Sequence, residues 1–592
     1  MTSEAVSTRR RIMAAMVVIL LVVVLFVIRL IDIQVVRAES LKADALEKMS
    51  STTTLFAPRG DIVDTNGTVL ASSIDTFEIL TSPKDVTEFK RKNDEGKWVK
   101  VPVAQAMQEV AGVLGVSPES LQTIVDDALA KDPNSSYAVL NKGVDFETFE
   151  KIRALKIDWL IIPRTFGRSY PNGAIAGNIV GFVGADNEGQ AGMELAMEQC
   201  LRGESGLQFA QRSKDRVALP GTTEILSEPK PGGTLQLTLD RDLNWAMAQL
   251  VASQVQETKA QYGIAMVTEV KTGKIRALAE APSVDPADVD GTPAEFRGSK
   301  AFQAPFEPGS IFKPLTAAML IDSGNATPND QVVAEYRYHP KPGVTIRDAL
   351  PHDPMNLTLT GVLQQSSNTG LSILGERMTS EARHDYLEKF GIGSPSGLKF
   401  PGESSGVMRP AKDWDGQTDY VTMFGQGLST TAVQMAHIYQ GIANKGVMLP
   451  LQLVEGCSYP DGTVTDVPEP SEGERVLSEK AATETIQMME TVVTDGFLAD
   501  QLRMPGYRVA AKSGTGEQFV NGKLQTTFVA SMAGAVPADD PEYVITVHLY
   551  SPLTSRSSAA AAPVFKEAVA QVIKKYGIAP ATTPGPDLKG RF

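Results

Sequence analysis

The longest apolar stretch of the chain lies close to its first residue. Residues 12–28 are all apolar, and the run resumes after Arg29 to end at Ile31. With the arginine side chain reaching toward the headgroups, this length is just sufficient for a helix that crosses a bilayer. Three consecutive arginines stand directly before the run. The positive-inside rule therefore predicts a cytoplasmic tail (1–11), a membrane anchor (12–31) and an extracytoplasmic remainder.

A cleaved signal peptide is the alternative interpretation of the same run. Val36-Arg37-Ala38 could pass as a cleavage site. The apolar core is longer than usual for a signal peptide, however, and Arg29, Asp32 and Arg37 make the approach to this site unusually charged. We therefore expect an uncleaved anchor and a single-pass protein of the cell membrane.

Helical and strand patterns are clearest in the second half of the chain. Apolar residues at helical spacing follow Pro308-Gly309 and predict a helix from Ser310 to about Ser323, and a second helical stretch covers 359–378. Strands are predicted at 264–270 and 275–279, joined as a hairpin, and at 507–511, 526–535 and 543–550. This order fits an α+β domain with an antiparallel sheet flanked by helices.

Three short motifs lie on these elements in one order. They are Ser310-Ile311-Phe312-Lys313, Ser366-Ser367-Asn368 and Lys512-Ser513-Gly514-Thr515-Gly516. A Ser-x-x-Lys motif combined with a Ser-x-Asn element and a Lys-[Thr/Ser]-Gly element is typical of enzymes that form an acyl-serine intermediate. The three motifs together therefore predict one acyl-transfer site.

Each motif also occurs elsewhere, and local context separates the copies. A serine and a lysine three residues apart share a face only on a helix. The copies at 227–230 and 396–399 lie among Pro and Gly residues that predict loops. Lys271-Thr272-Gly273 stands at the turn of the hairpin. Ser323-x-Asn325 would lie roughly 20 Å from Ser310 along one helix.

The residue types in the three motifs suit different chemical tasks. A serine hydroxyl becomes an effective nucleophile when a neighbouring base removes its proton. Lys313, one turn after Ser310, is the expected base, and burial or a second cation such as Lys512 would favour its neutral form. Ser366 is expected to relay protons between the two lysines and the leaving amine. Asn368 is expected to hold Lys313 and the substrate backbone, because its amide both donates and accepts.

With its flanking sequence, this set of motifs closely resembles the class B penicillin-binding proteins, which are membrane-anchored peptidoglycan transpeptidases. The resemblance implies an oxyanion hole formed by the backbone N–H groups of Ser310 and Thr515. Ser513, Gly514 and Thr515, with the charge of Lys512, would bind the terminal carboxylate of a D-Ala-D-Ala peptide. A β-lactam would acylate Ser310 by mimicking that carboxylate.

The resemblance extends through the first half of the chain. Residues 59–67 (Arg-Gly-Asp-Ile-Val-Asp-Thr-Asn-Gly) are similar to the opening signature of class B proteins, and so is Arg168-Ser169-Tyr170-Pro171, which is followed by spaced glycines and Glu194. This region carries no candidate nucleophile or base pair. We therefore expect a pedestal that sets the height of the active site and contacts partners. We find no glycosyltransferase motif, so glycan polymerisation should come from another protein.

A Pro/Gly-rich stretch, 220–233, is the best candidate for a domain boundary. It divides the extracytoplasmic part into a pedestal of mixed α/β structure (32–225) and a transpeptidase domain (226–577), which the resemblance relates to the serine β-lactamases. A Pro-rich tail (578–592) follows, and its composition predicts a loose segment.

Composition excludes several other functions. A net charge of −14 argues against nucleic-acid binding. The five histidines are scattered without metal-ligand spacing, and Gly425-Gln426-Gly427 is too weak a signal for a phosphate cradle, so neither a metal nor a cofactor is expected. By resemblance, these glycines lead into a helix at 431–444. Cys200 and Cys457 are far apart and in different predicted domains, so a disulfide between them is not expected.

The combined prediction is a D,D-transpeptidase that cross-links stem peptides through acylated Ser310 and is a target of β-lactams. Among class B proteins the chain looks more like the cell-division type. That likeness implies septal partners, including a polytopic SEDS-type glycosyltransferase and other divisome membrane proteins. The alternatives are an elongation-type transpeptidase, a D,D-carboxypeptidase or β-lactamase that passes the acyl group to water, a β-lactam sensor, and a divisome scaffold with dispensable enzymology.

Overall fold

The computed structural model describes residues 3–39, 50–93, 95–211, 219–520, 523–555 and 557–592. The chain divides into two compact units. The first combines 1–58 with 203–231, and the second combines 59–202 with 232–592.

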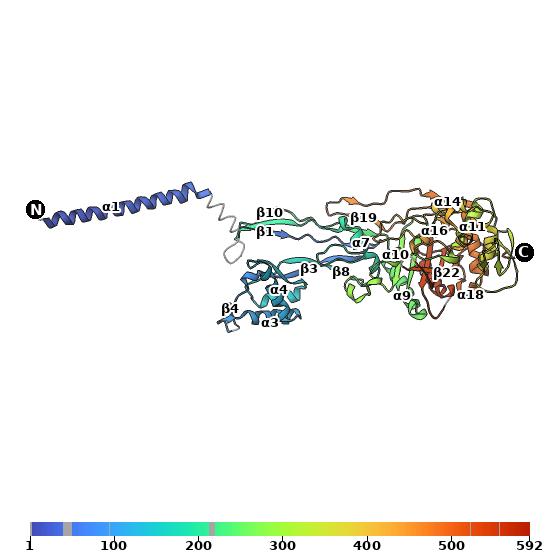
Figure 1. Ribbon diagram of the computed structural model, residues 1–592, viewed down its shortest axis with the longest axis horizontal. Helices are drawn as coiled ribbons and strands as arrows, with labels where there is room; N and C mark the ends of the chain where they lie inside the picture. Colours follow the sequence, from blue (N-terminus) through green and yellow to red (C-terminus); the bar gives the residue numbers. More distant parts are fainter. Residues whose placement is uncertain (1–2, 40–49, 94, 212–218, 521–522, 556) are drawn as a thin grey trace. The chain divides into compact units, whose positions relative to one another are not determined.

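The first unit contains a long helix and a small sheet. Helix α1 (Ser3–Ile31), drawn in dark blue in Figure 1, continues into a π-helical turn, η1 (Asp32–Val36). The segment Arg11–Val36 is long and apolar enough to cross a membrane. Three antiparallel strands form the sheet, in the order β1 (Ser50–Leu55), β9 (Gly206–Gln211) and β10 (Glu224–Ser227).

A mixed sheet runs through the N-terminal part of the second unit. Its main path is β20 (Val464–Thr465), β19 (Val454–Ser458), β11 (Thr234–Leu237), β2 (Ile62–Val63), β3 (Val69–Thr81) and β6 (Ala138–Val144). Two further strands, β7 (Leu160–Ile161) and β8 (Arg164–Ser169), pair with the long strand β3. Strands from both sides of the boundary predicted at 220–233 therefore share this sheet.

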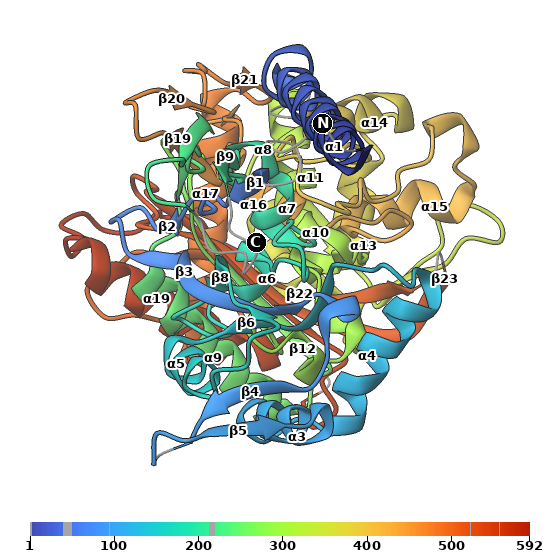
Figure 2. The ribbon, with the colours of Figure 1, turned by 90° about the vertical axis from the view of Figure 1, so that its left-hand side faces the viewer.

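Helices beside β3 enclose a separate small core. They are α3 (Val103–Leu114), α4 (Pro118–Lys131) and α5 (Phe146–Ala154). Val110, Leu121 and Ile152 of these helices pack with Ile79 of β3. In Figure 2, α3 lies next to the hairpin of β4 (Phe89–Lys92) and β5 (Trp98–Val101). Three short helices follow β8: α6 (Gly177–Val180), α7 (Gly192–Ala196) and α8 (Glu198–Leu201).

The two signatures of the first half meet in a buried ion network. Arg59 Nε donates to Glu194 Oε2 at 2.6 Å, and Arg168 Nε donates to Glu194 Oε1 at 2.6 Å. Arg59 Nη2 also lies 2.7 Å from Glu198 Oε2. The two arginine side chains are only 2% and 1% exposed, and that of Glu194 is 0% exposed. Buried charges of this kind stabilise the fold only when all partners are present, since removing one partner leaves the other buried without a counterion.

The C-terminal part of the second unit is built on a five-stranded antiparallel sheet. Its order is β13 (Ile275–Ala281), β12 (Tyr262–Glu269), β24 (Tyr543–Tyr550), β23 (Lys523–Val536) and β22 (Ala510–Val520). The helices that cover it are α9 (Arg241–Thr258), α11 (Lys313–Asp322), α16 (Ala432–Ala443), α17 (Glu479–Asp495) and α19 (Ala562–Tyr576).

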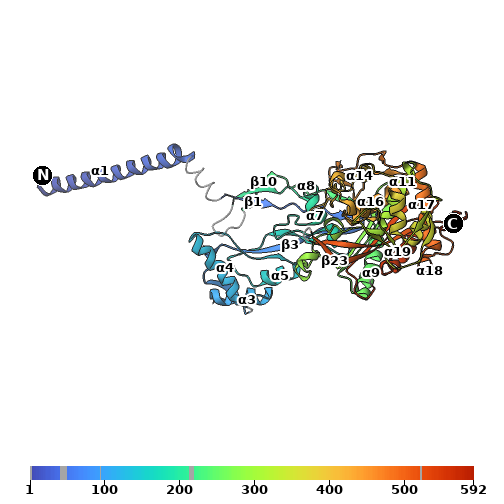
Figure 3. The ribbon, with the colours of Figure 1, turned by 45° about the vertical axis from the view of Figure 1, so that its right-hand side comes forward.

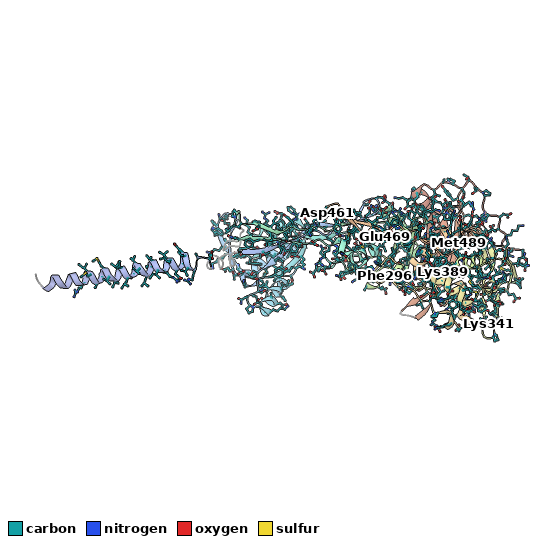
Figure 4. The ribbon with its side chains drawn as sticks, turned by 90° about the horizontal axis from the view of Figure 1, so that it is seen from above. Phe296, Lys341, Lys389, Asp461, Glu469 and Met489 are labelled. Atoms are coloured by element: carbon teal, nitrogen blue, oxygen red, sulfur yellow. A yellow bond between two sulfur atoms is a disulfide. The ribbon has the colours of Figure 1, made fainter. Side chains whose placement is uncertain are left out.

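Alternate residues of this sheet face opposite helix layers. Ala265 and Val267 of β12 belong to the core formed with α9 and α19, whereas Ile264 and Met266 belong to the core formed with α11, α16 and α17. Figure 3 shows α9 and α11 on opposite sides of the C-terminal part. In Figure 4, Lys341 projects at the outer end of this part, whereas Met489 of α17 is fully buried.

The remaining elements of the C-terminal part are short. The helices are α10 (Lys300–Gln303), α12 (Leu359–Gln365), α13 (Asn368–Gly375), α14 (Ser380–Lys389), α15 (Gly416–Val421) and α18 (Ala499–Leu502). The strands are β14 (Gln331–Ala334), β15 (Arg337–Tyr338), β16 (Ile346–Arg347), β17 (Met355–Thr358), β18 (Val447–Met448) and β21 (Glu474–Arg475).

The predicted helical stretch 359–378 is the main difference in secondary structure. It consists of two helices, α12 and α13, because Ser366 adopts a left-handed φ of 55° and ends α12. Ser367 then caps α13 by accepting a hydrogen bond from Gly370 N at 2.9 Å. The hairpin and the other three predicted strands are present, with shifted ends.

Cys200 and Cys457 form a disulfide, so the expectation that they would not pair was wrong. Cys200 lies in α8, and Cys457 lies on β19 opposite Leu235 of β11. Gly233 N donates to Cys200 O at 2.8 Å. The two cysteines meet because β19 and β11 belong to the sheet that crosses the predicted domain boundary.

The Pro-rich tail is also different from its prediction. It is not a loose segment but is hydrogen-bonded along its course: Ala581 N donates to Gly506 O at 2.9 Å, and Thr358 N donates to Gly590 O at 3.1 Å. Leu588 packs against the main hydrophobic core. The composition of the tail contained no information about the surface that receives it.

Candidate functional site

The serine of the Ser-x-x-Lys motif lies in a tight turn. Gly309, with a φ of 59°, leads into a 3-10 turn, η5 (Gly309–Phe312), in which Ser310 is half-buried. Lys313 then begins α11, and Pro314 fits there because the first helical turn has no donor to lose. The motif thus forms the helical start that its spacing predicts.

The two motif lysines converge on the hydroxyl of Ser366. Lys313 Nζ donates to Ser366 Oγ at 3.1 Å and to Ser366 O at 2.5 Å. Lys512 Nζ donates to the same Oγ at 3.0 Å and to Ser513 O at 2.8 Å. Both lysines are completely buried, whereas Ser366 is half-buried. One residue from each of the three motifs therefore meets in a single cluster.

Burial controls the protonation of this pair. It lowers the pKa of Lys313 to about 7, and the carboxylate of Asp348 acts in the opposite direction. Burial, together with the neighbouring charge of Lys313, lowers the pKa of Lys512 well below its usual value. Both nitrogens contact Ser366 Oγ, so they lie no more than about 6 Å apart, and two positive charges there would repel by roughly 3 kcal/mol. One amine is therefore neutral near neutral pH and can accept a proton.

Asp348 holds the residues that follow Ser366. Its Oδ1 accepts hydrogen bonds from the backbone N–H groups of Asn368 (2.5 Å) and Thr369 (3.0 Å), and its Oδ2 accepts one from Ser367 Oγ at 2.7 Å. A carboxylate at the N-terminus of α13 is also favoured by the helix dipole. We did not predict this residue, because a single aspartate in a loop belongs to no sequence pattern.

Asn368 differs from its predicted contact. Its Nδ2 donates to Arg347 O at 2.9 Å. Among the described residues, the hydrogen bonds of Lys313 Nζ go to Ser366, so the expected bond from Asn368 to Lys313 is not formed. The Asn368 side chain is half-buried at the start of α13.

Glycines allow strand β22 to lie directly against the turn of Ser310. A methyl group at Gly516 would meet Glu307 O at 1.7 Å, and one at Gly309 would meet Thr515 O at 2.1 Å. No side chain fits at either distance without moving the backbone. The Lys-Ser-Gly-Thr-Gly segment therefore lies beside the turn of Ser310, as a shared oxyanion hole would require.

The residues predicted to bind a carboxylate differ in exposure. Thr515 is exposed, whereas Ser513 is buried with its carbonyl bound by Lys512. A methyl group at Gly514 would meet Ile311 N at 2.6 Å, so this glycine also serves the close approach. Of these side chains, the hydroxyl of Thr515 is the most accessible to a bound peptide.

The Gly425-Gln426-Gly427 segment packs on the same turn from another side. Gly309 N donates to Gly425 O at 2.9 Å, and Gly427 N donates to Glu307 Oε1 at 2.8 Å. Burial raises the pKa of Glu307 to about 7, although the bond from Gly427 opposes the shift. After this segment, Thr431 caps α16, in agreement with the helix that the resemblance implied. The glycines therefore support the turn of Ser310.

The fold and the site together define a class of protein. A five-stranded antiparallel sheet covered by helices on both faces carries a Ser-x-x-Lys turn beside its edge strand, with a Ser-x-Asn turn opposite it. This is the arrangement of the serine enzymes that recognise penicillin.

The chain belongs to the penicillin-binding proteins. Residues 263–570 match the family model of the penicillin-binding protein transpeptidase domain, and residues 54–237 match that of the penicillin-binding protein dimerisation domain. Penicillin-binding protein PbpB of Mycolicibacterium smegmatis is 32% identical, over 94% of this chain and 89% of the relative. Peptidoglycan D,D-transpeptidase FtsI of Escherichia coli (strain K12) is 29% identical, over 89% of this chain and 85% of the relative.

A solved structure gives the same assignment. Penicillin-binding protein 3 from Mycobacterium tuberculosis, complexed with aztreonam, matches with a TM-score of 0.68 and 27% identity, covering 91% of this chain and 100% of that chain. The similarity therefore includes both the pedestal and the transpeptidase regions.

Proposed function

We propose that this chain is a peptidoglycan D,D-transpeptidase. The Oγ of Ser310 attacks the penultimate D-Ala carbonyl of a stem peptide, and the amide bond to the terminal D-Ala breaks. An amine from a neighbouring strand then attacks the acyl ester, which forms the cross-link and restores the serine hydroxyl. Family membership supports this proposal, as does the name of the E. coli relative.

The convergence of both lysines on Ser366 is the observation that carries the proposal. Lys313 in its neutral form takes the proton of Ser310 as the new bond forms. Ser366 passes a proton to the nitrogen of the departing D-Ala. Burial favours the neutral form of Lys313, and a proton held by Lys512 would favour it further. Asn368 holds the backbone of the substrate through its side-chain amide.

The packing of β22 on the serine turn supports a proposal for how the substrate binds. The backbone N–H groups of Ser310 and Thr515 stabilise the oxyanion of the tetrahedral intermediate. Ser513, Gly514 and Thr515 form the edge that receives the terminal carboxylate, aided by the charge of Lys512. A β-lactam presents the same carboxylate beside a reactive carbonyl, so it acylates Ser310; the M. tuberculosis neighbour was solved with such a compound.

The decisive experiment is intact-protein mass spectrometry of the detergent-solubilised chain after exposure to benzylpenicillin, with Ser310→Ala in parallel. We expect one long-lived adduct of one drug mass that maps to Ser310 and is absent from the variant. No adduct with unchanged drug would overturn the assignment of Ser310. No adduct with hydrolysed drug would indicate a β-lactamase instead.

The setting of the reaction is part of the proposal. The segment 12–31 anchors the protein with residues 1–11 in the cytoplasm, which the preceding arginines favour. The pedestal (32–225) and the transpeptidase domain (226–577) then lie outside, where peptidoglycan is assembled. The overall resemblance to cell-division proteins of class B supports a role in septal wall synthesis, with a SEDS-type glycosyltransferase and other divisome proteins as partners.

Depletion of the chain in growing cells tests the septal role. We expect cells that elongate without dividing, rescued by the wild-type chain but not by a stably expressed Ser310→Ala variant. Rounded cells after depletion would favour the elongation type. Rescue by the Ser310→Ala variant would favour a scaffold.

A further inference from the structure

The last residues of the chain run back over the C-terminal part to the helix that ends at Ser366. After α19, two tail residues are hydrogen-bonded to the segment that contains Gly506 and Arg508. Ala581 N donates to Gly506 O at 2.9 Å, and Thr583 Oγ1 accepts from Arg508 Nη1 at 3.0 Å. Leu588 then packs against the main core. The tail therefore reaches α12 along a defined path.

The end of the tail is bound to the N-terminus of α12. Thr358, the residue that caps this helix, donates its N–H to Gly590 O at 3.1 Å and its hydroxyl to Lys589 O at 2.6 Å. The hydroxyl of Thr358 also accepts the capping bond from Gly361 N at 3.1 Å. Next to it, Leu357 and Arg591 form an antiparallel bridge. The tail thus uses the same residue that starts the helix.

Two glycines make this contact possible. A methyl group at Gly361 of α12 would meet Gly590 O at 1.8 Å, and a methyl group at Gly590 would meet the side chain of Gln364 at 1.9 Å. Gln364 is itself almost fully buried. The tail backbone therefore lies directly on the helix surface, at a distance that admits no side chain on either partner.

We propose that residues 588–591, the terminal strap, position Ser366 for acyl transfer by fixing helix α12. The helix spans only Leu359–Gln365, so the strap contact at Gly361 lies about 8 Å along the axis from Ser366. A short rigid helix transmits a displacement at one end directly to the other. This inference rests on the proposed acyl-serine function of Ser310.

Loss of the strap has two expected effects on the site. The hydroxyl of Ser366 moves relative to both lysines, and a misplacement of about 1 Å slows acylation by roughly 10–100-fold. Water also reaches the cluster, which moves the pKa of Lys313 back toward its ordinary value. Among the described residues, the charged or titratable groups around Ser366 are Lys313 of α11, Lys512 of β22 and, through Ser367, Asp348, whose Oδ2 lies 3.0 Å from His352 Nε2. The acid limb of the pH–rate profile should therefore shift to higher pH.

The test compares the acylation rate of the detergent-solubilised full-length protein with that of a truncated protein that ends at Asp587. Fluorescent penicillin is the probe, measured as a second-order rate constant from pH 5 to 9, well below the unfolding temperature. Gly361→Ala is the second variant, because its methyl group clashes with the strap backbone. Gly112→Ala is the matched control: it also lies inside a helix, and its methyl group meets nothing within 4 Å.

We expect the truncation and Gly361→Ala to slow acylation and to shift the acid limb of the pH–rate profile to higher pH. Gly112→Ala should do neither. Combining the truncation with Gly361→Ala should add little further loss, because the clash disappears with the strap. Wild-type rate and pH profile in a folded truncated chain, or in a folded Gly361→Ala variant, would overturn the role of the strap. Fully additive losses in the combined variant would overturn it as well. Absence of any adduct on the wild-type chain would instead overturn the proposed function and the strap with it.

Discussion

Replacing Lys313 by methionine should stabilise the protein while abolishing acylation. Burial lowers the pKa of this lysine to about 7, against an ordinary value of about 10.4 in an unfolded chain. Folding at neutral pH therefore removes a proton from many molecules or buries a charge, and either outcome opposes folding. Methionine has a similar shape without this penalty.

The magnitude follows from the shift. At pH 7, a folded pKa of about 7 against an unfolded one of about 10.4 corresponds to a penalty of about 4 kcal/mol. Methionine removes this penalty but also loses the hydrogen bond to Ser366 O, which offsets about 1–2 kcal/mol of the stabilisation. The net stabilisation is then about 2–3 kcal/mol, which for a domain of this size is a Tm increase of about 3 °C.

The pH dependence distinguishes this cause from general repacking. Because the folded pKa lies below the unfolded one, unfolding takes up a proton, and the penalty is complete below pH 7 and disappears above about pH 10.4. We expect the Tm advantage of Lys313→Met, measured by scanning calorimetry, to be large at pH 7 and to shrink by pH 10. Lys412→Met, at an exposed position, is the control and should show no advantage at either pH. A variant that melts below the wild type at pH 7, or an advantage that is equal at both pH values, would refute the reasoning.

Three further changes should have measurable effects. Gly516→Ala should slow β-lactam acylation roughly 10–100-fold in stopped-flow assays, because its methyl group meets Glu307 O at 1.7 Å and displaces β22; a wild-type rate would contradict the packing. Replacing both cysteines by serine should lower Tm, since the disulfide joins residues separated by 257 positions and contributes at most about 5 kcal/mol. Glu194→Gln should destabilise by about 3–5 kcal/mol in denaturant unfolding, because buried Arg168 loses its counterion and buried Arg59 keeps only Glu198. Glu204→Gln, which breaks an exposed pair, should change stability by about 1 kcal/mol at most.

The sequence predicts the parts of the site that depend on local pattern. Helical spacing places Ser310 and Lys313 one turn apart, and the strand predicted at 507–511 runs into Lys512, which the structure places on β22. The strands of the central sheet are recognisable because they are apolar runs bounded by turn residues. The order of the three motifs along the chain is also read directly from the sequence.

Other features depend on contacts between distant residues and carry no local signal. Asp348 is a single carboxylate in a loop, and its importance arises only when α13 presents its first N–H groups to it. The cysteine pair requires the shared sheet of β11 and β19. The path of the tail depends on Gly361, whose missing side chain is unremarkable in a helical pattern. In each case the sequence around one partner gives no signal of the contact, which is recognised only when the structure places the other partner beside it.

The break between α12 and α13 shows why the site could not be built from an uninterrupted helix. Inside a helix, the carbonyl of Ser366 would already accept the N–H four residues later. The left-handed φ of 55° ends the helix and frees that carbonyl, which then accepts from Lys313 Nζ at 2.5 Å while the hydroxyl contacts both lysines. A glycine would adopt this backbone without strain but would lack the hydroxyl, so the chain retains a serine at a conformational cost of about 1–2 kcal/mol. That strain is offset by the surrounding anchors, namely Asp348 after the break and the packing of α12 before it.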